Sequence, residues 1–318
     1  MKLITFTNKT GEERIGWLEG DMVVDMNLLD DKLPTNMLSF IDNHESYFKI
    51  ISTHLNITPH YKIEEVKLLP PLPNPRSFRD YVAFEEHMLN ASKSFGHPVS
   101  KDWYDMPIFY FTNHHGVYGP NDDILCPKHE TNLDIELEMA VVIGKKGKDI
   151  TEEEAGDYIF GYTVFNDWTA RAIQRKEMTV PLGPHKGKDF ANSIGPCIIT
   201  KDEMEQYRCS ISRQSHPEHL AMPPQTSNRF DLKMTAKING RTICKGNYKT
   251  VHWTFPEMIQ RASENNVTLM PGDILGSGTV GWGSLMENNF SVHRPLASGD
   301  EVELEIEGIG VLKNKVVL

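Results

Sequence analysis

The chain has 318 residues, of which 39% are hydrophobic and 24% charged, with 33 Lys and Arg against 44 Asp and Glu (33 − 44 = −11). This composition is typical of a globular protein, and its negative charge repels a phosphate backbone, so we expect no nucleic-acid partner. No apolar run approaches the roughly 20 residues that cross a bilayer, and residues 1–17 lack the apolar core of a signal peptide. We therefore expect a cytoplasmic protein without a membrane partner.

Residues 1–72 are predicted to form a small, β-rich N-terminal α+β domain. Alternating apolar residues predict strands over 2–6, 13–19 and 21–26, and apolar residues at helical spacing predict a helix over 36–56. The following residues, 67–78, are rich in proline, which cannot sustain a helix and is typical of a linker. We place a domain boundary near residue 72, with a second domain over 73–318.

Strands predominate beyond that boundary. They are predicted over 107–112, 136–144, 158–166, 193–200, 271–278, 301–308 and 311–318, with a hairpin of 231–240 and 241–247. Helices are predicted over 84–95, 151–158, 168–178 and 255–265, with a capping box from Thr151 to Glu154 and Pro256 in a first turn. The order lacks the regular βαβ alternation of a parallel sheet, which indicates a mostly β, α+β fold.

The stretch LDIELEMAVVIG, residues 133–144, places acids at the start of a predicted buried strand. In a strand Asp134, Glu136 and Glu138 share one face with Ala140 and Val142. Burying unpaired carboxylates side by side costs several kcal/mol for each charge, so a positive group is expected beside them. A cross-strand Lys or Arg, or a solvated strand end, would suffice. The alternative is a hard divalent cation such as Mg²⁺, Mn²⁺ or Ca²⁺, which prefers oxygen ligands.

Two more acids could complete such a cation site. Asp167 follows an apolar strand in GYTVFNDWTARAIQ, and Asp80 lies seven residues before His87 in RDYVAFEEH. Each has an ordinary structural explanation as the cap of the helix that follows it, because Asp is a favoured N-cap residue. Taken singly, capping explains each of them better than metal binding does.

Taken together and in this order, the segments from about Arg76 to Glu287 resemble the fumarylacetoacetate hydrolase family. The resemblance implies that family's mixed β-sandwich roll with a small N-terminal domain, and a homodimer. It also implies roles for ten residues: Asp80, Glu136, Glu138 and Asp167 as metal ligands, His87, Glu287 and Lys188 as catalytic groups, and Arg171, Gln174 and Thr279 as substrate contacts. Members that act on fumarylacetoacetate usually carry a tyrosine where this chain has Val82, so the acyl group of the substrate stays open.

The chemistry of these residues suits a 1,3-dioxo acid as substrate. A divalent cation, with Mg²⁺ expected and Mn²⁺ or Ca²⁺ as alternatives, can chelate two substrate oxygens and stabilise the charge that develops on them. His87, oriented by Glu287, can deprotonate water, while Lys188 and Gln174 can stabilise the oxyanion. We therefore predict a metal-dependent hydrolase that cleaves a C–C bond in a fumarylacetoacetate-like or acylpyruvate-like diketo acid in aromatic catabolism.

Two other functions remain open from the sequence. One is decarboxylation or tautomerisation of a β-keto acid such as oxaloacetate, which the resemblance also allows. The other is a non-enzymatic protein whose carboxylates hold Ca²⁺ for stability.

The run GSGTVG, residues 276–281, satisfies GxGxxG, but no helix is predicted to begin at its glycines, so we interpret it as a loop rather than a dinucleotide site. Residues 201–230 receive no assignment.

Overall fold

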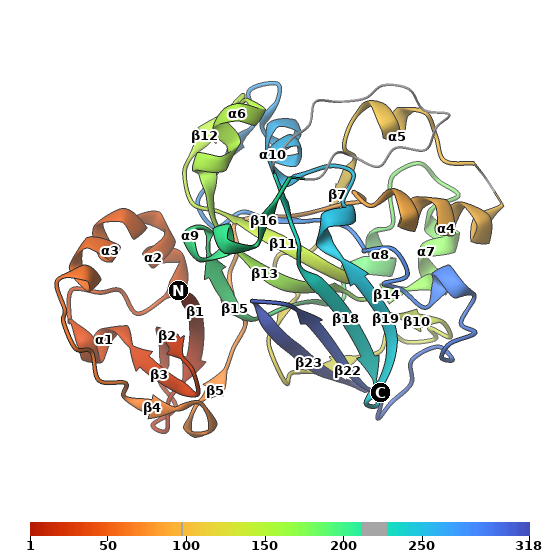
Figure 1. The fold of residues 1–318 in the computed structure, drawn as a ribbon. Coiled ribbons are helices and arrows are strands. Elements are labelled where there is room, and N and C mark those ends of the chain that lie inside the picture. Colours follow the sequence, from red (N-terminus) through yellow and green to blue (C-terminus); the bar gives the residue numbers. More distant parts are fainter. Residues whose placement is uncertain (97, 211–227) are drawn as a thin grey trace.

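The computed structural model describes residues 1–96, 98–210 and 228–318 and arranges most of their strands in two sheets (Figure 1). The larger, 12-stranded sheet has the order β4-β3-β2-β1-β15-β13-β11-β21-β6-β7, with β5 beside β1 and β8 beside β15. The smaller has the order β19-β18-β22-β23-β9. The mostly β, α+β class predicted from the sequence is therefore confirmed.

The elements have the following bounds. The large sheet contains β1 (Lys2–Thr7), β2 (Glu13–Glu19), β3 (Met22–Asp25), β4 (Tyr61–Lys62), β5 (Lys67–Leu68), β6 (Phe78–Tyr81), β7 (Phe109–Phe111), β8 (Val117–Tyr118), β11 (Leu137–Ile143), β13 (Ile159–Asp167), β15 (Asn192–Thr200) and β21 (Ile274–Gly276). The small sheet contains β9 (Asp123–Leu125), β18 (Lys233–Ile238), β19 (Arg241–Asn247), β22 (Glu301–Ile306) and β23 (Gly310–Val317). Short pairs are β10 (Leu133–Asp134) with β14 (Thr169–Ala170), β12 (Gly147–Lys148) with β20 (Thr268–Leu269), and β16 (Arg208–Cys209) with β17 (Arg229–Phe230). The α-helices are α1 (Met26–Leu29), α2 (Met37–Asp42), α3 (His44–Ser52), α4 (Glu85–Phe95), α5 (Asp102–Asp105), α6 (Glu152–Ala155), α7 (Arg171–Glu177), α8 (His185–Lys188), α9 (Lys201–Met204) and α10 (Phe255–Ser263), and the 3-10 turn η5 spans Met286–Asn288.

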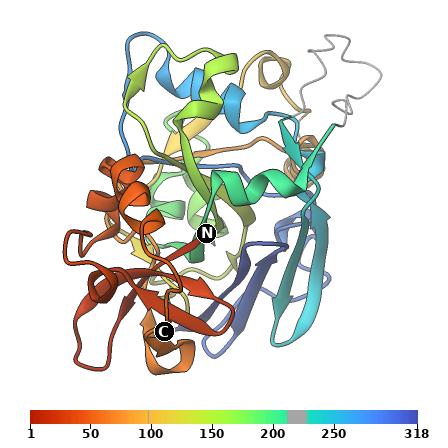
Figure 2. The same ribbon diagram turned by 60° about the vertical axis from the view of Figure 1, so that its left-hand side comes forward.

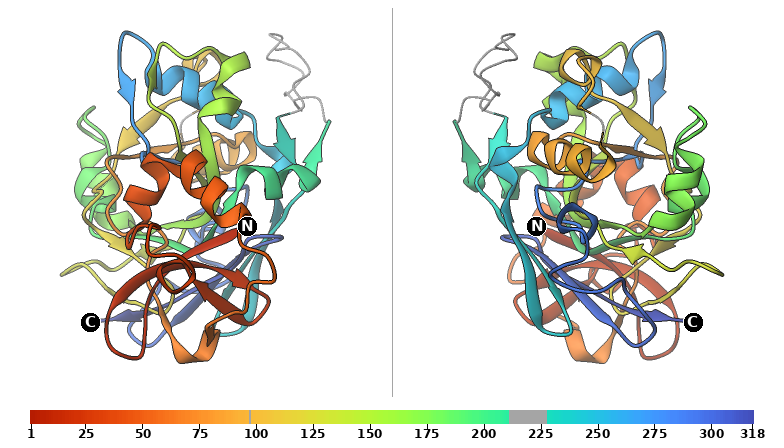
Figure 3. Two further views of the ribbon diagram at one scale, coloured as in Figure 1. Left: turned by 90° about the vertical axis from the view of Figure 1, so that its left-hand side faces the viewer. Right: turned by 90° about the vertical axis from the view of Figure 1, so that its right-hand side faces the viewer.

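The N-terminal strands and helices form the red and orange lobe at the left of Figure 1. Strand β1 of this lobe pairs antiparallel with β15, so the lobe shares the large sheet with the rest of the chain. Figure 2 shows the lobe and the blue and cyan strands of the small sheet side by side in the lower half of the molecule. Helices α4, α7 and α8 lie on the side opposite the lobe (Figures 1 and 3).

Strand β11 is buried on both faces, which explains its continuous apolar run. Ala140 and Val142 pack in the smaller core, which contains most of the buried apolar residues of the N-terminal lobe, while Met139, Val141 and Ile143 pack in the larger core. A strand covered on both sides has no solvated face for a charge. The carboxylates at its start therefore need partners inside the protein.

Most predicted elements are confirmed, with three corrections. The helix predicted over 36–56 is two helices, α2 and α3, which meet at Asn43 with φ −133°. The helix predicted from residue 168 begins at Arg171, because residues 169–170 pair with β10. Strand β10 ends at Asp134 and β11 begins at Leu137, so the three alternating acids do not share one strand.

Two further expectations concern membrane-spanning segments and residues 201–230. None of the described helices is long and apolar enough to cross a membrane. Of the unassigned stretch 201–230, residues 211–227 lie outside the described residues, and the remainder includes α9 and the β16–β17 pair.

Candidate active site

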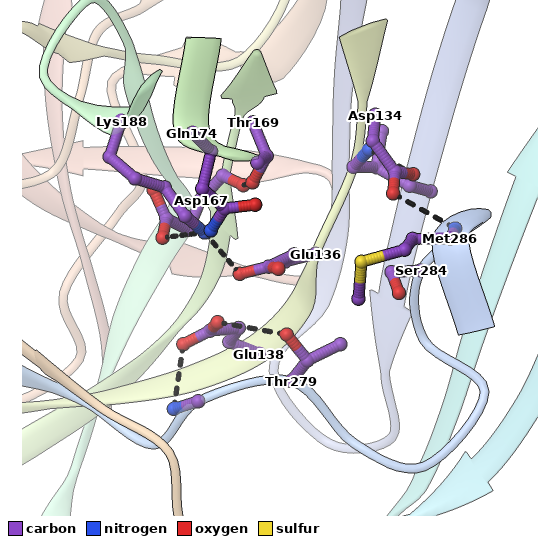
Figure 4. A network of polar contacts seen from close by, with 12 residues as sticks. Asp134, Glu136, Glu138, Asp167, Thr169, Gln174, Lys188, Thr279, Ser284 and Met286 are labelled. Atoms are coloured by element: carbon purple, nitrogen blue, oxygen red, sulfur yellow. Dashed lines mark hydrogen bonds and ion pairs between the residues drawn. The ribbon is translucent and has the colours of Figure 1, made fainter. Parts of the chain in front are cut away.

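Four carboxylates from separate parts of the chain converge at one end of the large sheet. Asp80 lies on β6, Glu138 on β11, Asp167 at the end of β13, and Glu136 directly before β11. One oxygen of each lies within 4.8 Å of the others, and all four residues are buried. Figure 4 shows Glu136, Glu138 and Asp167 from close by. We call these four residues the carboxylate cluster.

Strand register explains this convergence. Strands β11 and β13 are antiparallel, and Leu137 pairs with Asn166 at one end of this ladder. Glu136, just before Leu137, and Asp167, just after Asn166, therefore lie at the same end of the sheet. Strand β21 separates β11 from β6, and Gly276 on β21 pairs with Asp80. A Cβ atom at Gly276 would meet the Oδ1 atom of Asp80, so this glycine leaves room for the carboxylate. The sheet order thus joins acids that are up to 87 residues apart (167 − 80 = 87).

The cluster carries more negative charge than its protein neighbours neutralise. Two carboxylates about 4.8 Å apart repel each other by about 3 kcal/mol at an effective dielectric constant near 20. Burial and the neighbouring acids raise the pKa of Asp80 and Glu138 well above the usual values. Burial also acts to raise the pKa of Glu136, but Lys188 and Arg171 overcome it and lower that pKa to about 2. Two of the acids are therefore poorly compensated.

Three contacts define the compensated side of the cluster. The Nζ atom of Lys188 donates to Glu136 at 2.5 Å and to Asp167 at 2.6 Å (Figure 4). The hydroxyl of Tyr110 donates to the same Oδ2 atom of Asp167 at 2.5 Å. The other oxygen of Asp167 and the Oδ1 atom of Asp80 are buried without a hydrogen-bond partner. These two oxygens, in a cluster of four buried carboxylates, fit a divalent cation with oxygen ligands.

His87 and Glu287 form a second, charge-balanced group beside the cluster. The Nδ1 atom of His87, on α4, lies 3.2 Å from Oε2 of Glu287 and forms an ion pair with it when the ring is protonated. Glu287 accepts further hydrogen bonds from Asn90, from the backbone of Trp282, and from the backbone and hydroxyl of Ser284. All of these partners orient the carboxylate toward the histidine.

The pKa shifts of this pair agree with its geometry. Burial is the strongest single influence on the pKa of His87 and lowers it, but the charge and close contact of Glu287, together with the charge of Glu136, raise that pKa overall. Burial would raise the pKa of Glu287, but His87 and the surrounding donors lower it. A histidine whose Nδ1 faces a carboxylate keeps Nε2 for proton transfer, as in other acid–base sites.

Arg171 and Gln174 lie on α7, at the edge of the carboxylate cluster. Arg171 donates through Nε to Asp134 at 2.9 Å and through an Nη atom to Gln174 at 3.0 Å, and its other Nη atom lies 2.7 Å from Glu136. The N-terminus of α7 is held by Glu130, which accepts from the amides of residues 172 and 173. Arg171 is only 5% exposed, so its charge acts within the site.

The glycine-rich loop after β21 forms another wall of the site. The amide of Gly278 donates to Glu138 at 2.8 Å, and the hydroxyl of Thr279 lies 3.4 Å from the same carboxylate (Figure 4). Gly278 has φ +76°, and a Cβ atom there would meet the Tyr81 carbonyl oxygen. No helix starts at these glycines, which agrees with the interpretation of residues 276–281 as a loop.

All ten predicted site residues therefore lie in one region of the molecule, and Glu136 has the basic partners expected of a buried acid, Lys188 and Arg171. The two capping explanations, however, are wrong. Asp167 does not cap α7, whose N-cap is Ala170, and Asp80 does not cap α4, whose N-cap is Phe84. Asp134 is separated from the other two acids of its motif, since it contacts Arg171 and not the cluster.

Three residues with clear places in the site were not assigned from the sequence. They are Tyr110 on β7, Asp134 on β10 and Gly276 on β21. Tyr110 lies in a strand of three consecutive aromatic residues, FYF, and carries no local motif. Asp134 belonged to the acidic motif but looked equivalent to its neighbours. Gly276 was placed at the end of a predicted strand and in a loop, but its contact with Asp80 was not foreseen, because the strand that it faces is remote in sequence.

Comparison with known proteins identifies the family to which this fold belongs. Residues 76–317 match the model of the fumarylacetoacetate (FAA) hydrolase C-terminal family. The chain is 30% identical to fumarylacetoacetase of Arabidopsis thaliana over 78% of its length and 66% of that protein. It is also 30% identical to the mitochondrial oxaloacetate tautomerase of Xenopus laevis, over 100% of its length and 90% of that protein. The chain belongs to the fumarylacetoacetate hydrolase family.

Solved structures support the same fold. A fumarylacetoacetate hydrolase from Exiguobacterium antarcticum superposes with a TM-score of 0.72 at 25% identity, covering 100% of this chain and 99% of that one. A maleylpyruvate hydrolase from Sphingobium sp. SYK-6, solved in complex with manganese(II) ion and pyruvate, gives 0.71 at 23% identity with the same coverage. The chain spans 66% and 56% of the Arabidopsis and rice fumarylacetoacetases, so its similarity to those proteins covers only part of them.

Proposed function

We propose that this protein is a divalent-metal-dependent hydrolase that cleaves a C–C bond in a 1,3-diketo acid of the fumarylacetoacetate or acylpyruvate type. The observation that carries the proposal is the carboxylate cluster placed beside the His87–Glu287 pair. Asp80, Glu136 and Glu138 would hold the cation together with Asp167. When bound, it would supply Lewis-acid stabilisation of the substrate's dioxo group. Mg²⁺ is the cation we propose first, and the manganese complex of the related maleylpyruvate hydrolase supports Mn²⁺ as well.

The residues of this chain then divide the chemistry among them. Glu287 holds His87 so that Nε2 can take a proton from water, which makes that water nucleophilic near neutral pH. Lys188 keeps its charge, because Asp167 and Glu136 raise its pKa against the opposing effect of burial. Its ammonium and the amide of Gln174 can stabilise negative charge on the attacked carbonyl oxygen in the transition state.

A test of the hydrolase proposal follows loss of enol absorbance with acylpyruvates and fumarylacetoacetate. We expect turnover with Mg²⁺ or Mn²⁺, loss of turnover with a chelator, and loss in the His87→Ala variant that still binds the cation. The matched control is His54→Ala, since His54 lies in the N-terminal lobe after α3. Full activity of the His87→Ala variant would rule out His87 as the base.

Tautomerisation of oxaloacetate is the second candidate, because the similarity to the Xenopus laevis tautomerase extends over the whole chain. Decarboxylation of oxaloacetate is distinguished from both other reactions by the release of carbon dioxide. A hydrolase gives two fragments, and a tautomerase gives neither fragments nor gas. A structural Ca²⁺ protein would show a higher melting temperature with the metal and no turnover of any oxo acid.

The homodimer, the cytoplasmic location and the place in aromatic catabolism remain predictions drawn from the resemblance and composition.

A further inference from the structure

Asp134 lies fully buried between the two halves of the site and outside the carboxylate cluster (Figure 4). Its Oδ1 atom accepts from the amide of Leu285 at 2.8 Å, and its Oδ2 atom accepts from the amide of Met286 at 3.0 Å. Met286 begins the short turn η5, and Glu287 is the next residue. The carboxylate of Asp134 therefore anchors the segment that carries the partner of His87.

The same carboxylate also contacts the opposite half of the site. Its Oδ2 atom accepts from Nε of Arg171 at 2.9 Å, and Arg171 lies 2.7 Å from Glu136 of the cluster. One buried side chain thus connects the guanidinium beside the proposed cation ligands to the two amides that precede Glu287, the partner of the proposed base. Charge-assisted hydrogen bonds of this kind hold geometry more firmly than neutral ones do.

This link matters because the His87–Glu287 contact leaves little room for displacement. The two side chains are 3.2 Å apart and come from α4 and η5, elements about 200 residues apart in sequence (287 − 87 = 200). A shift of about 1 Å in a supporting element can lower a rate by about 100-fold. The amides that bind Asp134 belong to the two residues directly before Glu287, so loss of Asp134 would release that segment at the point where placement counts.

We propose that Asp134 is a positioning residue that fixes Glu287, and through it His87, relative to the carboxylate cluster. Its effect on turnover rests on the proposed function, whereas its effect on the placement of His87 does not. Asp134 contacts none of the four acids of the carboxylate cluster, and Arg171 is the one proposed substrate contact to which it is hydrogen-bonded. It acts by joining Arg171 to the backbone of the segment that carries Glu287, the partner of the base.

The first test replaces Asp134 by asparagine in the full-length, Mn²⁺-loaded protein. An amide keeps the shape but offers one acceptor oxygen in place of two, so it cannot satisfy both amides and Arg171. We expect kcat to fall by about 10- to 100-fold, with KM and the Kd for Mn²⁺ changed by less than about 3-fold. Asp25→Asn is the matched control. Asp25 is equally buried and accepts from the amides of Asn27 and Leu28, but it lies in the N-terminal lobe.

A double variant separates positioning from general loss of structure. If Asp134 acts through Glu287, then Asp134→Asn combined with Glu287→Gln is as slow as Glu287→Gln alone. Multiplying losses would overturn the proposal. A wild-type protein that turns over no dioxo acid would contradict the proposed function instead, and the next measurements would still decide the role of Asp134.

Two measurements need no turnover. In NMR titrations the pKa of His87 is expected to fall in Asp134→Asn toward its value in Glu287→Gln, and to stay at the wild-type value in Asp25→Asn. An unchanged His87 pKa in Asp134→Asn overturns the proposal. In the wild type, which requires no variant to fold, the amide protons of Leu285 and Met286 are expected to exchange slowly with solvent. Rapid exchange of both amides would equally contradict the anchoring role.

Discussion

The carboxylate cluster and the His87–Glu287 pair are neighbouring buried sites with opposite electrostatic characters. The cluster gathers four acids around one lysine and one edge of Arg171, and two of its buried oxygens lack partners. The pair joins one base to one acid, and its acid accepts from several donors. Buried charge is tolerated where it is matched. The cluster is therefore suited to bind an additional positive charge, whereas the pair is complete.

The pKa shifts show that neighbours, more than burial, decide this difference. Glu138 and Glu287 are both deeply buried glutamates, yet the pKa of Glu138 is raised well above its usual value and that of Glu287 is lowered. Other acids surround Glu138, while His87 and N–H donors surround Glu287. Variants that change one neighbour at a time can therefore separate the two sites.

The largest effect is expected from removal of the cation. Chelation should reduce kcat/KM by about 1,000-fold or more, because Lewis-acid stabilisation contributes several kcal/mol and each 1.36 kcal/mol is a factor of ten. Glu138→Gln should act similarly and should weaken Mn²⁺ binding measured by calorimetry. Glu153→Gln, on the exposed surface of α6, is the control and should leave both quantities unchanged. Full activity of the protein in the presence of chelator would refute the claim that the carboxylate cluster acts by binding a cation.

Glu287→Gln should have the next largest effect, without loss of cation binding. We expect kcat to fall by about 100- to 10,000-fold, the range for general acid–base catalysis. As a base, His87 must be neutral, so activity disappears as the pH falls through its pKa. Glu287 is the main group that raises that pKa in the wild type, and burial opposes it, so loss of the Glu287 charge should lower the pKa of His87. The acid limb of the rate profile should therefore move to lower pH, and an unmoved limb would contradict the pairing.

Tyr110→Phe should have an intermediate effect on the cluster side. Burial and the acids around it raise the pKa of Tyr110 well above its usual value, so its hydroxyl stays protonated and donates to Asp167. Loss of this donor should weaken Mn²⁺ binding or activity by roughly 10-fold, as other partners of metal ligands do. Tyr104→Phe, at a hydroxyl that donates to Glu85, provides a control with an expected change below about 2-fold.

The smallest effect concerns stability without the cation. Asp80 has a raised pKa in the folded protein, so the folded state binds more protons than the unfolded state between the ordinary pKa and the raised one. Stability of the cation-free protein should therefore increase as the pH falls through that window. Asp80→Asn removes the charge and should raise the cation-free Tm by a few degrees, about 2–4 °C per kcal/mol in a chain of this size.

Calorimetry in chelator, at several pH values, provides the readout for Asp80→Asn. The increase in Tm of Asp80→Asn over the wild type should be largest at high pH, where the wild-type carboxylate is ionised. The same variant should lose the rise in Tm that Mn²⁺ gives the wild type. Destabilisation at every pH would show that Asp80 is adequately neutralised by the protein itself.

Much of the fold could be predicted from the sequence because its signals are local. The alternation in residues 13–19 and the proline-led helix α10 depend only on neighbouring residues. The division of residues 36–56 at Asn43 and the break between Asp134 and Leu137 were missed, because their apolar patterns continue across the interruptions.

The site was predicted less from spacing than from the ordered set of motifs. Spacing alone indicated a charge problem at Glu136 and Glu138, and capping explained Asp167, taken singly, better than metal binding did. The roles of Gly276 and Asp134 depend on which strands become neighbours and on which amides reach a buried carboxylate. Such contacts join segments more than 100 residues apart, and no local pattern encodes them.

Anomalous diffraction from crystals soaked in Mn²⁺ tests the central claim most directly. The account predicts one strong manganese peak bonded to oxygens of Asp80, Glu136, Glu138 and Asp167, with His87 adjacent. A peak bound elsewhere, or none among these four carboxylates at saturating Mn²⁺, would contradict it.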